Sequence, residues 1–297
     1  MTDNPKPKVS KSKSKDDKSK NKKGTKNLFG EGPKILPVLD PTEKDDWGEN
    51  VHPHLPAIGG FGGGSLTLII GAVKTGKSTL LSNLFLNDDM YGQDQFDYVK
   101  IMSNTISNDI TSRFLKEAYD VDDYYSDDII RGIIEEQKKY EKKDQPKIAI
   151  LADDLLGSVG RNALLWQLCS RYRHYNIRML AISSQNFRQV SPVARQNCQN
   201  LIITSPFPNF KEMRKISEEF GDVVGGEKNF LAIYKYATPE RYDFLHMDLQ
   251  SNPVKCYKNF DILIAEGQKL YFDPNSIDLS EFSGKNQVIG VANTEDI

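Results

Sequence analysis

The chain has 297 residues, enough for one large domain or two small ones. Its 38% hydrophobic and 27% charged residues are ordinary for a soluble globular protein, and no apolar run approaches the roughly 18–20 residues of a membrane span. The polar, lysine-rich start predicts no secretory signal. The three cysteines form no C-x-x-C pair, which disfavours a disulfide framework or a zinc site and favours a reducing intracellular compartment.

The first residues differ in charge from the rest of the chain. Ten lysines and three aspartates give residues 1–27 a charge of +7, which leaves −9 for the remainder of a chain whose net charge is −2. Residues 1–34 have almost no apolar side chains, so we predict a disordered basic arm. It is either a tether to nucleic acid or an acidic partner, or a solvating tail. Residues 35–64, rich in proline and glycine, predict an irregular lead-in.

Residues 65–250 alternate between strand and helix patterns, which predicts an α/β core with a mainly parallel sheet flanked by helices. Strands are expected at 66–70, 98–103, 147–152, 178–184 and 201–204. Helices are expected from 79, and at 108–119, 126–143, 162–175 and 210–220, with an acidic loop at 120–128. Residues 229–236 and 242–249 resemble a hairpin. Residues 251–297 form a C-terminal extension without assigned structure.

A phosphate loop follows the first strand. Residues 71–78 match the pattern G-x-x-x-x-G-K-[ST] without a mismatch: Gly71, Ala72, Val73, Lys74, Thr75, Gly76, Lys77 and Ser78. Thr79 continues into a helical pattern, so the motif has the strand–loop–helix context it needs. Backbone N–H groups and the helix N-terminus bind phosphates there. We therefore predict that residues 71–79 bind ATP, with Lys77 on the β- and γ-phosphates and Ser78 on Mg²⁺.

Two carboxylates end the apolar strand that runs through Ile148, Ala149, Ile150, Leu151 and Ala152. Asp153 is expected to hold the Mg²⁺ shell through water, and Asp154 to polarise the attacking water. Many motors have glutamate in the second position, and aspartate is shorter by one methylene. The alternative is a plain strand followed by a turn.

Gln185 follows the strand at 178–184. In open α/β sheets the carboxyl ends of strands line the ligand crevice. A glutamine amide in that place can donate to the γ-phosphate and accept from the attacking water, so we predict a catalytic sensor. The alternative is a helix N-cap or a simple polar group in a loop.

An arginine ahead of the same strand is the remaining candidate. Arg173 is proposed to stabilise the transition state in a neighbouring subunit. The alternative is a cation at the end of a helix. Arg161, Arg188 and Arg195 are rival candidates.

The segments around this strand resemble the FtsK–HerA superfamily of DNA-pumping ATPases, in particular the genome-packaging ATPases of large double-stranded DNA viruses and virophages. The matching features are the Arg-His-Tyr-Asn-Ile run at 173–177, Gln185, and the Arg-x-Asn-Cys segment at 195–198. The similarity covers roughly residues 60–250.

The resemblance implies a RecA-like core in which the strand before Gln185 lies between the phosphate-loop strand and the strand before Asp153. It also implies a homo-oligomeric ring, most simply a hexamer, around double-stranded DNA. Capsid or portal-vertex proteins would be partners, and the virion or a cytoplasmic viral factory the location. Lys77, Ser78, Asp153, Gln185 and Arg173 carry over in the roles given above.

The expected function is thus an ATP-hydrolysing motor that translocates double-stranded DNA into a capsid. Two alternatives stay open: a nucleotide kinase or other small-molecule phosphotransferase, and a non-catalytic, nucleotide-dependent assembly protein. The acidic body counts against a DNA channel, because a channel that follows phosphates should be positive.

Overall fold

The computed structural model describes residues 52–59, 63–106, 112–155, 157–207 and 209–282. The chain divides into units at residues 1–43 and 44–297, and every described residue belongs to the second unit. The predicted basic arm, most of the lead-in and the last fifteen residues lie outside the described residues.

One mixed sheet runs through the fold, in the strand order β10-β9-β8-β7-β6-β1-β5-β4-β2-β3. Neighbouring strands from β6 to β3 are parallel, and those from β6 to β10 are antiparallel. The strands are β1 (Ser65–Ile70), β2 (Tyr98–Ser103), β3 (Asp120–Asp122), β4 (Ile148–Asp153), β5 (Ile177–Ser184), β6 (Asn200–Thr204), β7 (Phe244–Asp248), β8 (Lys255–Lys258), β9 (Ile262–Glu266) and β10 (Lys269–Leu270).

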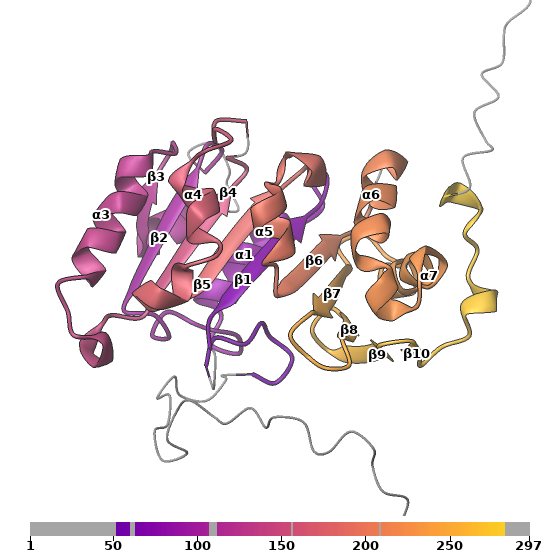
Figure 1. Cartoon of the computed structure of the whole chain (residues 1–297). Helices are drawn as coiled ribbons and strands as arrows, with labels where there is room; N and C mark the ends of the chain where they lie inside the picture. The colour runs from indigo at the N-terminus through magenta and orange to yellow at the C-terminus, as the bar shows by residue number, and fades with distance from the viewer. Residues whose placement is uncertain (1–51, 60–62, 107–111, 156, 208, 283–297) are drawn as a thin grey trace, which may run out of the picture. The chain divides into compact units, whose positions relative to one another are not determined.

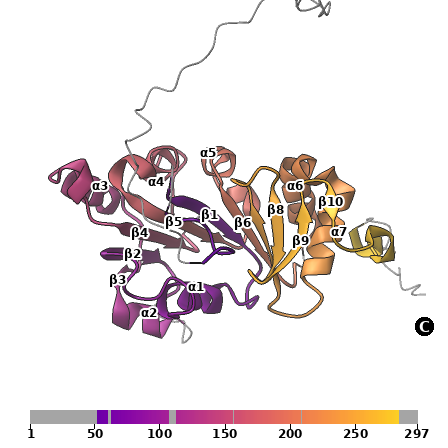
Figure 2. The ribbon, with the colours of Figure 1, turned by 90° about the horizontal axis from the view of Figure 1, so that it is seen from below.

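Helices cover both faces of this sheet (Figures 1 and 2). They are α1 (Lys77–Leu86), α2 (Arg113–Ala118), α3 (Asp127–Gln137), α4 (Leu164–Leu168), α5 (Pro192–Gln196), α6 (Phe210–Phe220) and α7 (Glu227–Ala237). Short 3-10 turns lie at Lys142–Asp144, Tyr172–Tyr175, Phe187–Gln189, Asp222–Val224, Pro274–Ser276 and Ser280–Phe282. Among the described residues, no helix combines the length and apolar character that crossing a bilayer requires.

Two apolar cores result from this layering. Helices α1 and α2 pack on one face through side chains such as Leu84 and Leu115. Helices α3 to α7 pack on the other through side chains such as Ile130, Ile216 and Ile233. The central strands β1, β4 and β5 are buried on both faces, which explains their continuous apolar sequences. The predicted α/β class with a mainly parallel central sheet is confirmed.

The position of β5 decides where the predicted site residues meet. It pairs with β1 on one side and with β4 on the other, in parallel register. The strand order that the sequence resemblance implied is therefore present. Because all three strands run the same way, their carboxyl ends lie at one edge of the sheet.

The hairpin predicted for residues 229–236 and 242–249 is wrong in its first half. Residues 229–236 belong to helix α7, whose buried side chains Phe230, Ile233, Tyr234 and Ala237 follow the helical spacing i, i+3, i+4, i+7. Only the second half is a strand, β7, which pairs with β6 and β8.

Several predicted boundaries also differ. The helix expected at 126–143 ends at Gln137, and the one expected at 162–175 is the short α4 followed by a 3-10 turn. The acidic loop at 120–128 contains β3, where Lys100 pairs with Asp120 and Asp122, both at 2.8 Å. Strands β8, β9 and β10 extend the same sheet beyond residue 250.

Candidate nucleotide-binding site

The predicted phosphate loop connects β1 to α1 in a conformation that depends on its glycines. Gly76 caps α1 with φ 89°, a left-handed value that favours glycine. A Cβ atom on Gly71 would lie 1.7 Å from Oγ1 of Thr204. The Gly71 N–H donates to the carbonyl of Ser184 at 3.1 Å, which joins the loop to the end of β5.

Threonine hydroxyl groups fix the side of the loop that lies against β6. Oγ1 of Thr75 lies 2.6 Å from Oγ1 of Thr204 and donates to the carbonyl of Ala72 at 2.8 Å. Both threonines are buried. Thr204 ends β6, so the loop is held between the tips of β5 and β6.

Lys77 is buried at the start of α1, with 6% of its surface exposed. Its Nζ donates to the carbonyl oxygens of Gly71 at 2.8 Å and Ala72 at 2.9 Å. Burial lowers the pKa of Lys77, and the negative charges of Asp154 and Asp153 act against that shift. The cation is thus held within the loop and within electrostatic reach of the acid pair.

Asp153 ends β4 and is also only 6% exposed. Oγ of Ser103, at the tip of β2, donates to its Oδ2 at 3.0 Å. Burial raises the pKa of Asp153, and the Lys77 charge acts in the opposite direction. A buried carboxylate within electrostatic reach of a cation is suited to a site that binds a charged ligand.

Asp154 leaves the strand with φ 48°, in the left-handed region. Its N–H donates to the carbonyl of Ser183 at 3.1 Å, and its Oδ2 accepts from Nε2 of Gln185 at 3.1 Å. The structure therefore brings together the two acids and the glutamine that the sequence placed on separate strands.

A cavity of about 770 Å³ lies at this edge of the sheet. Its lining includes most of the predicted residues: Val73, Lys74, Thr75, Gly76, Lys77, Ser78, Thr79, Asp154 and Gln185. Gly71, Ala72 and Asp153 do not line it, although the first two bind Lys77 through their carbonyls.

The oxygen donors here fit Mg²⁺. Ser78 lines the cavity, and Asp153 precedes the lining residue Asp154 at the tip of β4. Mg²⁺ prefers few protein oxygens completed by water and phosphate. Within the described residues no group of three or more histidine, cysteine or acidic side chains could hold a metal unaided. The residues therefore suit a metal that binds together with a nucleotide.

Sequence reasoning missed part of the lining. Thr105, Thr204, Arg241, Tyr242 and Phe244 all border the cavity. They come from loops and strand ends that carry no phosphate-binding motif. The one available signal for Thr204 was that it is a polar residue at the end of β6. Because β6 lies next to β1, its end must lie at the same edge of the sheet as the phosphate loop.

The structure does not bring Arg173 to this cavity. It lies in the 3-10 turn before β5, exposed, with its guanidinium 5.7 Å from the Tyr172 ring centre. The eight residues of β5 separate it from the edge that bears Gln185, a span of about 25 Å. Within one chain the two residues lie at opposite ends of the same strand.

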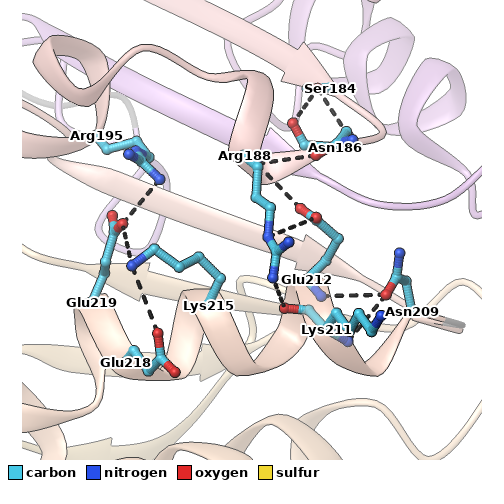
Figure 3. Close-up of polar contacts among 10 residues, drawn as sticks. All are labelled: Ser184, Asn186, Arg188, Arg195, Asn209, Lys211, Glu212, Lys215, Glu218 and Glu219. Carbon is cyan, nitrogen blue, oxygen red and sulfur yellow. Dashed lines mark hydrogen bonds and ion pairs between the residues drawn. The ribbon is translucent and has the colours of Figure 1, made fainter.

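Two rival arginines are engaged inside the chain (Figure 3). Arg188 pairs with Glu212 at 3.2 Å and donates to the carbonyl of Lys211. Arg195, 14% exposed, pairs with Glu219 at 2.9 Å. Both connect the segment after β5 to helix α6, which gives them a structural role. Arg161 is exposed in the turn that follows β4.

No family model and no curated protein matches the chain. Similar solved structures include the genome packaging NTPase B204 from Sulfolobus turreted icosahedral virus 2 with sulfate, 19% identical over 65% of this chain and 96% of that chain, with a TM-score of 0.48. B204 from Sulfolobus turreted icosahedral virus, described as a DNA-packaging ATPase, is 22% identical over 64% of this chain and 95% of that chain, with a TM-score of 0.47.

EssC (ATPases 2 and 3) from Geobacillus thermodenitrificans is 16% identical over 52% of this chain and 34% of that chain, with a TM-score of 0.38. By its own strand order and loop geometry, the chain has an α/β phosphate-loop NTPase fold.

Proposed function

We propose that the chain is an ATP-hydrolysing motor that translocates double-stranded DNA, and that it packages a viral genome. The observation that carries the catalytic part is the meeting of Lys77, Asp154 and Gln185 around one cavity, with Asp153 within electrostatic reach of Lys77. Three parallel strands deliver these groups to one edge, where ligands bind in open α/β sheets.

Each residue has a role in this proposal. The phosphate loop binds the triphosphate through its backbone amides, and Lys77 exchanges its two carbonyl partners for phosphate oxygens. Ser78 and Asp153 would hold Mg²⁺, which would supply positive charge to neutralise the phosphates. The Gln185 amide orients a water molecule that attacks the γ-phosphorus, and Asp154 accepts its proton. The bond between the γ-phosphorus and the β–γ bridging oxygen breaks, and ADP leaves with that oxygen.

Arg173 is proposed to act in a neighbouring subunit. Since it lies at the opposite end of β5 from Gln185, it can reach a cavity only in another copy. A closed ring, with six subunits as the expected number, supplies every cavity with an arginine from its neighbour. An arginine in trans also couples successive hydrolysis events.

Duplex DNA as the substrate rests on the sequence resemblance around residues 173–198. Helix α6 is not a convincing DNA surface, because Arg214 and Lys215 pair with Glu218 and Lys215 also with Glu219. We propose that the basic arm supplies attraction to DNA that the acidic body lacks. Capsid or portal-vertex partners, and a virion or viral-factory location, belong to the same proposal.

The proposal is tested by displacement of a third strand from linear duplex DNA. We expect displacement with Mg²⁺ and ATP, and none in the Lys77→Ala variant, whose folding is checked by its circular dichroism. A nucleotide kinase would instead pass phosphate to a small acceptor, and an assembly protein would turn over no ATP. Turnover that yields a phosphorylated acceptor and displaces no strand would refute the motor.

A further inference from the structure

Two side chains of the cavity have no role in the mechanism above. Arg241 and Tyr242 lie in the turn between α7 and β7, and both line the cavity. Tyr242 is 56% exposed, and the guanidinium of Arg241 lies 4.9 Å from the centre of the Tyr242 ring. Tyr242 therefore contributes to the cavity lining and not to a buried core.

This turn lies against the phosphate loop. A Cβ atom on Gly76 would be 3.2 Å from Cδ1 of Tyr242, so the ring borders the start of α1 closely. Nη2 of Arg241 donates to the carbonyl of Lys74 at 3.5 Å. The ring therefore lies beside the loop proposed to hold the phosphates, within reach of the rest of a nucleotide.

The backbone fixes the ring there at some cost. Tyr242 has φ 76°, a conformation that is rare for an aromatic residue. Its N–H donates to the carbonyl of Ser205 at 3.3 Å, and the N–H of Ser205 donates to the carbonyl of Asp243 at 2.9 Å.

The next side chain anchors the turn further. The Asp243 carboxylate accepts from Nδ2 of Asn259 at 2.6 Å and pairs with Lys258 at 3.3 Å. Unusual backbone conformations held by several contacts are concentrated at functional sites. The turn is thus built to present one exposed ring to the cavity.

The cavity lining is divided in chemical character. Lys77, Asp154 and Gln185 supply charge and amide groups, whereas Leu80, Met90 and Phe244 supply apolar surface from α1, the turn after it and β7. A nucleoside triphosphate has the same two characters, because a flat base follows a charged phosphate chain. Aromatic rings stack on bases of any identity.

We propose that Tyr242 is the surface on which the nucleobase stacks, and that Arg241 positions the ring. The inference rests on the proposed nucleotide site. A different explanation is that the turn only braces the phosphate loop. The two differ in one respect: a base platform affects ligands that have a base, whereas a brace affects every ligand with phosphates.

The test compares ATP with inorganic tripolyphosphate by calorimetry on the full chain. We expect Tyr242→Ala to weaken ATP binding roughly 10-fold and to change tripolyphosphate binding by less than about twofold, while Tyr242→Phe keeps both. Tyr124→Ala is the matched control, since that tyrosine is 53% exposed outside the cavity. Thermal unfolding of each variant checks the fold.

A base analogue gives an independent readout. The fluorescence of 2-aminopurine riboside triphosphate should be quenched when it binds to the wild type or to Tyr242→Phe. The Arg241→Ala variant should quench it less, and the Tyr242→Ala variant should not quench it. Equal weakening of ATP and tripolyphosphate, or unchanged ATP binding, in Tyr242→Ala would overturn the inference. A wild-type chain that binds neither ligand would instead refute the proposed nucleotide site itself.

Discussion

The side-chain amide of Gln185 donates to the carboxylate of Asp154 at 3.1 Å. This contact joins the tips of β5 and β4, two neighbouring parallel strands in which Asp153 lies opposite Ser183. The proposed water-orienting group and the proposed proton acceptor are therefore in contact. They should act on the same water molecule.

We expect Asp154→Asn and Gln185→Ala to leave ATP affinity within a few-fold of wild type and to lower kcat by about 10²- to 10⁴-fold each. Because both residues act on one water, the double variant should be little slower than the slower single variant. Single-turnover kinetics measure this directly. Losses that multiply in the double variant would show that the two residues act independently.

Arg173→Ala should bind ATP almost normally and lose about 10³-fold or more in kcat. Arg171→Ala, an exposed arginine two residues earlier in the chain, is the matched control and should keep its rate. Mixing two variant subunits tests whether the arginine acts between subunits. Lys77→Ala subunits retain Arg173, so adding them to Arg173→Ala subunits should restore part of the turnover.

That recovery can occur only if the arginine acts between subunits. Absence of recovery, in mixtures that native mass spectrometry shows to be mixed rings, would argue against the proposed role. A normal kcat in Arg173→Ala would remove this residue from the mechanism altogether.

Gly71→Ala should abolish ATP binding while the sheet stays folded. The new methyl group would lie 1.7 Å from Oγ1 of Thr204 and 2.8 Å from Oγ1 of Thr75, both buried, so the phosphate loop must move. Gly132→Ala is the control, because a Cβ there meets nothing within 4 Å. Calorimetry measures ATP binding by both variants, and circular dichroism checks their folding. Unimpaired ATP binding by Gly71→Ala would contradict the loop geometry.

Asp153 should make stability depend on pH. Burial raises its pKa, so the folded protein keeps this proton at pH values where the unfolded chain has lost it. Linkage then lowers the free energy of unfolding as the pH rises from the unfolded pKa, about 3.9, through the raised folded value. The ionised carboxylate therefore costs stability at neutral pH, and that cost disappears on acidification.

Asp153→Asn should accordingly raise the urea midpoint of the nucleotide-free protein at pH 7, by less as the pH falls toward about 3.9. Mg²⁺ with ATP should stabilise the wild type but not this variant. Asp123→Asn, at an exposed position, is the control. A lower midpoint for Asp153→Asn at pH 7 would mean that the carboxylate stabilises the fold without a ligand.

Much of the candidate site could be predicted because its residues lie in short motifs at strand ends. The residues from Gly71 to Ser78, Asp153 and Gln185 each follow an apolar run, and parallel strands bring such positions together. The central strands were also predictable, since strands buried on both faces have continuous apolar sequences.

The remainder depends on contacts between distant segments. The apolar residues of 229–236 are compatible with either a strand or a helix. The segment is helical because Phe230, Ile233 and Ala237 then all pack in the core against the sheet. Tyr242 reaches the cavity only because β7 folds back beside β6, with the turn hydrogen-bonded to Ser205. No local pattern in the sequence encodes that return.

The decisive measurement for the proposed motor is the steady-state rate of ATP hydrolysis with Mg²⁺, taken with and without linear duplex DNA for the wild type and Lys77→Ala. We predict turnover that duplex DNA accelerates and that the variant lacks. Equal rates for the two proteins, or no turnover by the wild type under either condition, would contradict the proposed motor.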